Sequence, residues 1–357
     1  MDLARGIAVL LMIEAHTFDA WTRPADRATV WFQRSAVLAG FAAPLFLWLA
    51  GLAVVLSAAA TERRSGRAAA MDAVWRRGLE IFVLAFLFRL QAFTVSPGSH
   101  PITLFRVDIL NIMGPAVFMA GIIWGLCRGS VLLAAVYAVC ACAIAMLTPV
   151  VRTMALVGSL PTWLQWYIRP AGEHTTFTAF PWIGFVFAGA ACGVPLVSAS
   201  LASQERRLHA WLAVVGVALV TIGIYTASLP TLYRESSFWT SSPTYFAVRV
   251  GIIVMIFSSS YVLAQGVLRV GLTFGPLERL GRSSLFVYWI HVELVYGYAA
   301  RAIRGRLPLW GTVAAYAAFT ALMYGAVVAR DRLVDAWRRR SLYRPPVPAS
   351  ALGQPPN

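Results

Sequence analysis

The stretch SAVLAGFAAPLFLWLAGLAVVLS fills residues 35–57 and contains no charged residue. A helix needs about 20 consecutive, mainly apolar residues to cross a bilayer, so this stretch predicts a membrane-spanning helix. Nine further runs share its length and apolar character. The ten runs expected to span are residues 3–21, 35–57, 77–93, 107–126, 131–150, 180–197, 211–228, 246–268, 283–302 and 309–329. We therefore predict an all-α fold, a polytopic membrane helix bundle of about ten transmembrane helices.

The overall composition supports this class. Of the 357 residues, 59% are hydrophobic and 13% are charged, whereas soluble domains average about 45–50% apolar and about 25% charged residues. These values exclude a soluble globular enzyme and a disordered chain. We expect one integral membrane domain over residues 1–340, followed by a disordered, proline-rich cytoplasmic tail over residues 341–357.

The net charge of +15 comes entirely from arginine, since the chain has no lysine. Such a charge could indicate nucleic-acid binding, but the arginines lie mainly between the apolar runs, where the positive-inside rule places them. We predict no nucleic-acid partner, both termini in the cytoplasm, and the cytoplasmic membrane of a bacterium as the location. The four cysteines show no CxxC spacing, so we expect small buried side chains without disulfides or metal.

Ionisable side chains interrupt several of the apolar runs. Each costs about 2.5–3.5 kcal/mol near the centre of a spanning helix, so these residues are candidates for function. The candidates are Arg5, Glu14, His16, Glu80, Arg89, Asp108 with Asn111, Arg249, His291 and Glu293.

Arg5 and His16 are eleven positions apart in the first run. Eleven helical steps return to within roughly 20° of the same direction and rise about 16 Å. One helix face thus carries a cation near the cytoplasmic surface and an imidazole deep in the membrane. This geometry suits acyl-coenzyme A, whose phosphates would meet Arg5 while its thioester reaches His16. The alternatives remain that Arg5 is a charge anchor and that His16 is structural.

The other ionisable residues have simpler interpretations beside the functional ones. Glu14 lies about 200° from His16 around the helix and is expected to pair with another helix. A local ion pair with Arg76 or Arg77 accounts for Glu80. Arg89, Asp108 and Arg249 would either line an acceptor cavity or pair with one another. His291 and Glu293 should point apart.

Several sequence motifs resemble known membrane enzymes. The opening DLARGIA at residues 2–8, followed by His16, is similar to the transmembrane acyltransferase superfamily, whose acyltransferase-3 branch has an Arg/His pair in its first helix. A closer resemblance is to bacterial membrane proteins related to heparan-α-glucosaminide N-acetyltransferase. It rests on FAAPLFLWLAG (41–51), RRGL (76–79), VDILNIMG (107–114), FPWIG (180–184) and LGRSSLFVYWIH (280–291).

The resemblance implies an acetyltransferase that takes its acetyl group from cytoplasmic acetyl-coenzyme A and delivers it to an extracytoplasmic sugar or glycan. It places Arg5 and His16 at the paired first-helix positions, with Arg282 as a second coenzyme A ligand. The remaining candidates at the acceptor side are Glu14, Arg89, Asp108, Arg249 and His291. In the glucosaminide branch the active histidine lies beyond the first helix, but residues 19–34 contain none, which leaves His16. The chain also begins inside the motif, and we expect further residues before Met1.

The expected chemistry needs a base and an oxyanion donor, and no metal. Imidazole, with an unperturbed pKa of about 6.5, suits His16 as the base that accepts a proton from the attacking acceptor. Asn111, Tyr288 or a backbone amide would stabilise charge on the thioester oxygen. Alternatively, His16 could itself be acetylated.

Two other classes of function stay open on the sequence alone. A proton-coupled secondary transporter would use Glu14, His16, Asp108 and His291 as a relay. A non-catalytic partner in envelope polymer assembly would not depend on His16.

Overall fold

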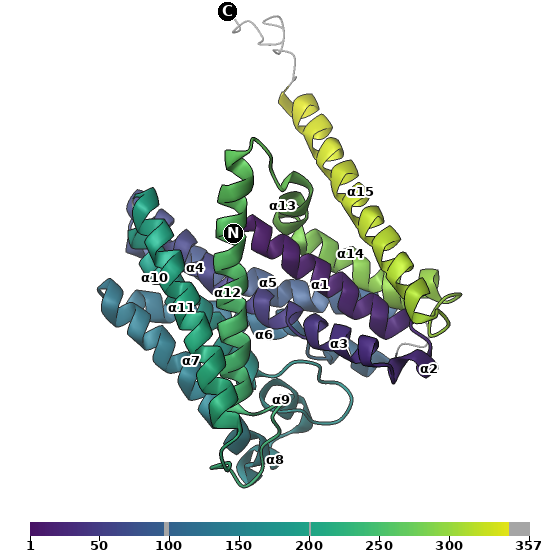
Figure 1. The fold of residues 1–357 in the computed structure, drawn as a ribbon, viewed down its shortest axis with the longest axis horizontal. Helices are drawn as coiled ribbons and strands as arrows, with labels where there is room; N and C mark the ends of the chain where they lie inside the picture. The colour runs from purple at the N-terminus through teal and green to yellow at the C-terminus, as the bar shows by residue number, and fades with distance from the viewer. Residues whose placement is uncertain (96–99, 200, 343–357) are drawn as a thin grey trace, which may run out of the picture.

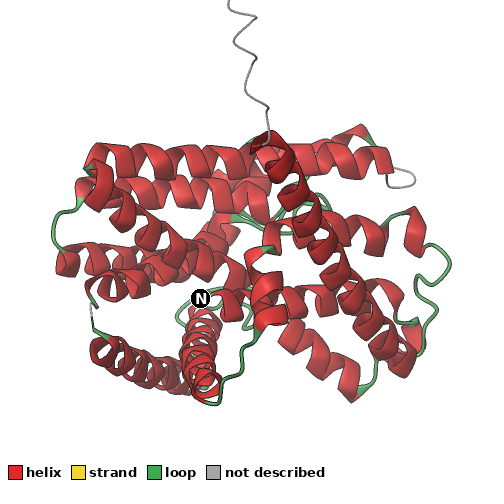
Figure 2. Cartoon of the chain, turned by 90° about the horizontal axis from the view of Figure 1, so that it is seen from above, coloured by secondary structure: helices red, strands yellow, loops and turns green. Residues whose placement is uncertain are grey.

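The structure, a computed structural model, describes residues 1–95, 100–199 and 201–342, with side chains described to residue 339. Every regular element in these ranges is helical. The helices are α1 (Asp2–Trp21), α2 (Pro24–Arg27), α3 (Val30–Ala39), α4 (Ala42–Ser65), α5 (Arg67–Val95), η1 (Pro101–Phe105), α6 (Ile109–Leu126), α7 (Ser130–Thr153), α8 (Ala155–Gly158), α9 (Thr162–Ile168), α10 (Ala179–Ser198), α11 (Ala202–Ala227), α12 (Pro243–Arg269), α13 (Gly275–Arg282), α14 (Ser284–Tyr296), η2 (Tyr298–Ala300) and α15 (Leu309–Leu342). Figure 2 shows the all-helical bundle from above, which confirms the predicted fold class.

Each of the ten predicted runs coincides with a helix. Among the described residues, eight helical segments are long and apolar enough to cross a membrane: Val30–Ser65, Arg67–Val95, Ile109–Leu126, Ser130–Thr153, Ala179–Ser198, Ala202–Ala227, Pro243–Arg269 and Leu309–Arg339. The other two runs are α1, which carries several charges, and α14, a shorter apolar helix. The prediction of ten spans therefore remains a prediction, because these two helices do not meet the same standard.

Several boundaries differ from those expected: α4 ends at Ser65, α5 begins at Arg67 and α11 begins at Ala202, so these helices are longer than the predicted runs. The second run divides at Gly40 and Phe41 into α3 and α4, and Pro44 stands in the first turn of α4, where its missing N–H costs no hydrogen bond. At the other end, α15 continues to Leu342, so the first two residues of the expected tail are helical. Residues 343–357 lie outside the described residues.

Two hydrophobic cores divide the bundle. The larger core is built mainly by α4, α5, α6, α7, α10 and α12. The smaller core is built by α1, α14 and α15, which lie together on one side of the molecule in Figure 1. The candidate site lies where these two cores meet.

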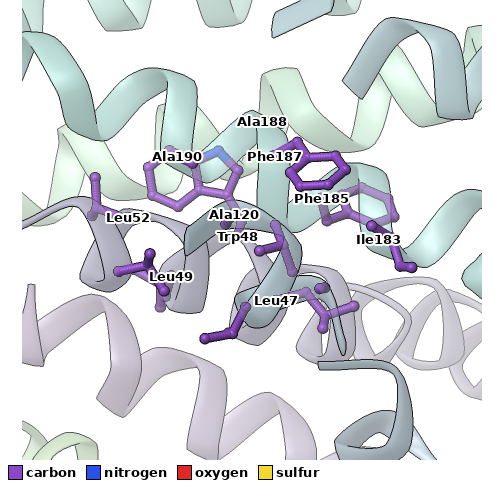
Figure 3. Packing of buried hydrophobic residues seen from close by; sticks show 14 of the residues in the cluster. Leu47, Trp48, Leu49, Leu52, Ala120, Ile183, Phe185, Phe187, Ala188 and Ala190 are labelled. Atoms are coloured by element: carbon purple, nitrogen blue, oxygen red, sulfur yellow. The ribbon is translucent and has the colours of Figure 1, made fainter. Parts of the chain in front are cut away.

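Close packing of α4 against α10 centres on Trp48, which is completely buried (Figure 3). A methyl group at Gly189 would overlap the backbone of Trp48, and one at Gly51 would overlap the carbonyl of Val186. Small residues at such positions let helix backbones approach closely, which is how membrane helices gain packing energy.

The same principle joins α1 to α13. A side chain at Gly6 would meet the carbonyl of Leu277, and one at Gly281 would meet the carbonyl of Asp2. This close contact brings the end of α13, with Arg282, beside the first turn of α1.

The far end of α1 is fastened to the segment that enters α15. The carboxylate of Asp26 accepts a 2.7 Å hydrogen bond from the backbone N–H of Leu309 and forms an ion pair with Arg23. The hydrogen bond from Leu309, aided by Arg23, holds the pKa of Asp26 below its ordinary value. The C-terminal end of α1 and the N-terminal end of α15 are thereby held side by side.

The four cysteines are all free thiols, as expected. The expectation that they are buried is wrong for Cys142, which is exposed on α7. Its neighbours Val139 and Met146 are exposed on the same helix, so this face of α7 is one that would contact lipid.

Candidate active site

A cavity of about 1300 Å³ lies between the two cores and is lined mainly by α1, α4, α5, α6 and α14, with further residues from α10, α12 and α13. Arg77 and Arg89 of α5 both line it and are twelve positions apart, which corresponds to about 18 Å along a helix. The lining residues Arg5 and Asp19 of α1 are about 21 Å apart by the same measure. Pockets for drug-sized ligands span about 300–1,000 Å³, so this cavity has room for a long ligand or for two ligands.

One end of the cavity, the Arg5 end, is formed by Arg5, Arg77 and Arg282. Asp2 lies between two of these arginines, 3.7 Å from Arg5 and 3.6 Å from Arg282. Arg77 pairs with Glu80 at 3.1 Å, which confirms the predicted local ion pair. Three guanidinium groups thus share two carboxylates, and this end remains attractive to anions.

His16 lines the middle of the cavity and is hydrogen-bonded to His291 of α14. Its Nδ1 is 2.8 Å from Nε2 of His291. The two rings are parallel within 4°, with centroids 4.9 Å apart. Rings stacked face to face stay about 3.5 Å apart, so an N···N distance of 2.8 Å means that the two parallel rings meet at their nitrogen edges. Nδ1 of His291 in turn lies 2.8 Å from the carbonyl oxygen of Val287.

Tyr296 and Asp19 flank His16 on the cavity side. The ring of Tyr296 stands at 64° to that of His16, with centroids 5.7 Å apart. Its hydroxyl donates a 2.8 Å hydrogen bond to the carboxylate of Asp19. Tyr296 therefore contacts the imidazole of His16 in addition to His291.

The other end of the cavity, the Arg249 end, is formed by Arg89, Asp108 and Arg249. Arg89 and Asp108 form an ion pair with little exposure of either side chain. The guanidinium of Arg249 lies 4.2 Å from the ring centroid of Tyr245 and 5.9 Å from that of Trp182. Its buried Nε has no hydrogen-bond partner among the described residues. The two alternatives for these residues thus both apply, since Arg89 and Asp108 pair while lining the cavity.

A short backbone bridge fixes the position of this end. The N–H of Val107 donates to the carbonyl of His174, and the N–H of Thr176 donates to the carbonyl of Val107. Asp108 follows directly as the N-cap of α6, and Arg106 hydrogen-bonds the hydroxyl of Thr176 at 2.8 Å.

Seven of the ten residues predicted for the site line this cavity, and three do not. The lining residues are Arg5, His16, Arg89, Asp108, Arg249, Arg282 and Tyr288. Asn111 is buried, and its side-chain oxygen accepts from the backbone N–H of Asp108 at 2.9 Å, so this oxygen caps α6. Glu14 and His291 also lie outside the lining, although His291 reaches the site through His16.

Other lining residues were not singled out from the sequence. They include Asp19, Arg106, Tyr296 and Arg304. Asp19 follows His16 by three positions, a spacing that places both on one helix face. The sequence alone could therefore have indicated Asp19 as a site residue. As expected, Glu293 and His291 point apart, since Glu293 lines the cavity and His291 is buried in the core behind it. The contact between His16 and His291 joins residues 275 positions apart, and no local pattern indicates it.

An all-helical membrane protein with a long cavity that carries cations at both ends and a histidine between them is the class defined by this fold and site. The family model described as heparan-alpha-glucosaminide N-acetyltransferase, catalytic, matches residues 1–230. The chain therefore belongs to this family of membrane acetyltransferases. A comparison with curated proteins returned no significant match.

Proposed function

We propose that this protein transfers an acetyl group from cytoplasmic acetyl-coenzyme A to a hydroxyl or amine of an extracytoplasmic sugar or glycan. The observation that carries the proposal is the single cavity lined by both Arg5 and His16. It supports the geometry that the spacing of these two residues predicted, with a cation and an imidazole facing one continuous space.

Coenzyme A would bind at the Arg5 end. Arg5 and Arg282 would hold its phosphates through charge-assisted hydrogen bonds, for which guanidinium geometry is suited. The pantetheine arm would then run along an apolar wall that includes Phe46, Ala50 and Val54 of α4. The thioester would reach His16 from this direction.

The acceptor would bind at the Arg249 end. Trp182 lines the cavity there and offers an aromatic face to a sugar ring, and Arg249 adds hydrogen-bond donors directed at hydroxyl or anionic groups. Under the proposed topology this end faces the outside of the cytoplasmic membrane.

The transfer step then follows from these positions. The acceptor oxygen or nitrogen attacks the thioester carbonyl carbon and forms the new C–O or C–N bond, while its proton moves to Nε2 of His16. The C–S bond breaks, and His16 returns the proton to the departing thiolate of coenzyme A. The hydroxyl of Tyr288, which also lines the cavity, is the proposed donor to the oxyanion. Acetylation of His16 itself is the alternative route.

The arrangement gives no support to a proton relay through the membrane. Of the four residues that such a transporter would use, Glu14 and His291 do not line the cavity, and Asp108 is paired with Arg89. We therefore prefer acetyl transfer.

The test measures release of free coenzyme A by purified protein in nanodiscs, with acetyl-coenzyme A and D-glucosamine, D-glucose or N-acetylglucosamine as trial acceptors. The wild type should turn over with at least one acceptor, and His16→Ala should be at least about 100-fold slower, since a lost general base costs 10²–10⁴-fold. His209→Phe is the matched control, because His209 is a buried histidine stacked on Tyr261 outside the cavity. Full turnover by His16→Ala would remove the role of His16, and no acetyl-coenzyme A binding by the wild type would remove the proposed activity.

A further inference from the structure

We infer that His291 is a positioning residue that fixes the tautomer of His16, so that His16 presents the unprotonated Nε2 to the cavity. The inference rests on the proposed function for its catalytic meaning. The hydrogen bonds themselves set the tautomer, whatever the acceptor is.

The carbonyl oxygen of Val287 determines which nitrogen of His291 carries the hydrogen. A carbonyl only accepts hydrogen bonds, so Nδ1 of His291, 2.8 Å away, must carry a hydrogen. His291 is completely buried, and burying a charge in an apolar core is costly, so its ring is neutral. Its Nε2 therefore holds a lone pair.

The lone pair on Nε2 of His291 in turn determines which nitrogen of His16 carries the hydrogen. Since Nε2 of His291 accepts, Nδ1 of His16 must donate across the 2.8 Å contact. The parallel rings meet at these two nitrogens, so the N–H bond of His16 is directed toward the lone pair of His291. A neutral His16 then has no hydrogen left for Nε2, which becomes the acceptor required of a general base.

The orientation of the His16 ring is constrained as well. A histidine that could turn about its side-chain bonds would exchange the positions of its two nitrogens. The edge contact with Tyr296, whose hydroxyl is bonded to Asp19, and the hydrogen bond with His291 both oppose such a turn. The proton gained at Nε2 during the transfer leaves the Nδ1–H bond and its partner unchanged.

The direct test is ¹⁵N NMR of histidine-labelled protein in nanodiscs without substrate. The chain has 5 histidines, and His16→Gln identifies the signals of His16 by their disappearance. In the wild type, His16 should show the Nδ1–H tautomer, whereas in His291→Leu it should show a mixture of both neutral tautomers. A wild-type His16 that carries its hydrogen on Nε2 would overturn the inference, even if His291→Leu does not fold.

A kinetic test asks whether the tautomer matters for catalysis. His291→Leu should lower kcat by between about 10-fold and 10⁴-fold, the range seen when the partner that orients a functional histidine is lost, with KM for acetyl-coenzyme A unchanged. His291→Gln retains an acceptor oxygen and should recover part of this loss, while His209→Phe should match the wild type.

The two tests separate the possible failures. If His291→Leu keeps full kcat, the positioning role is wrong while the proposed acetyl transfer stands. If the wild type shows no acetyl transfer but His16 has the Nδ1–H tautomer, the proposed function fails and the hydrogen-bonded pair remains as described.

Discussion

At the scale of single residues, the arginines of the Arg5 end attract anions, while the carboxylate of Asp2 competes with a ligand for the same guanidinium groups. Asp2 lies within ion-pair distance of both Arg5 and Arg282. A bound phosphate would have to share these guanidinium groups with the Asp2 carboxylate. If coenzyme A binds here as we propose, its affinity would depend on the arginines and on Asp2, and each can be substituted separately.

We expect Arg5→Ala to raise KM for acetyl-coenzyme A by roughly 10-fold with little change in kcat, since hydrogen bonds to charged groups contribute about 1.5–3 kcal/mol. Asp2→Asn should lower KM, because a competing anion is lost. Steady-state kinetics measures both, with Arg64→Ala as the control, since Arg64 is exposed and does not line the cavity. Equal effects of Arg5→Ala and Arg64→Ala would contradict the assignment of Arg5.

The sequence predicted the relation between Arg5 and His16 because helix periodicity fixes which residues of one helix share a face. It could not predict that His16 meets His291, because that contact depends on how α1 and α14 pack. Asn111 is a different case, because its role could be read from local spacing. Its apolar surroundings made it a candidate donor, but its spacing from Asp108 is that of a capping pair, and its side-chain oxygen is used there.

At the scale of helices, glycine positions decide how closely neighbours pack. The sequence identified the apolar runs well, because length and hydropathy are local properties. It did not show that α3 and α4 are separate helices or which glycines face a neighbour. Gly51 and Gly266 are both helical, yet Gly51 meets the backbone of α10 and Gly266 has nothing within 4 Å.

This contrast predicts opposite responses to the same substitution. Gly51→Ala should destabilise the protein by about 1–3 kcal/mol, the usual cost of overpacking. Gly266→Ala should leave stability unchanged or raise it by up to about 1 kcal/mol through helix propensity. Thermal unfolding in detergent, followed by tryptophan fluorescence, compares the two variants. A Tm for Gly51→Ala at or above that of the wild type would show that α4 and α10 do not pack as described.

At the scale of the whole molecule, the cavity lies between two cores, and the topology of the chain decides which side of the membrane each end of the cavity faces. The arginine distribution predicts both termini in the cytoplasm. The segment between α11 and α12 would then lie outside, and the start of α11 would lie inside. Ser236 and Ser203 are exposed in these two places.

Single-cysteine variants test this topology, with the four native cysteines replaced by alanine. Ser236→Cys should react with a membrane-impermeant maleimide in intact cells. Ser203→Cys should react only after permeabilisation, and each variant serves as the control for the other. The reverse pattern would place the Arg5 end outside the cell and exclude cytoplasmic acetyl-coenzyme A as the donor.

The hydrogen-bonded pair ends at the carbonyl of Val287, and this has a consequence for an energised membrane. A peptide carbonyl has no hydrogen to pass on, so a proton taken up by His16 cannot continue through His291 to the opposite side. It must leave by the path along which it came. If His16 acts as we propose, the proton that it takes up in each transfer is not conducted across the membrane through this pair, and acetyl transfer does not dissipate a proton gradient.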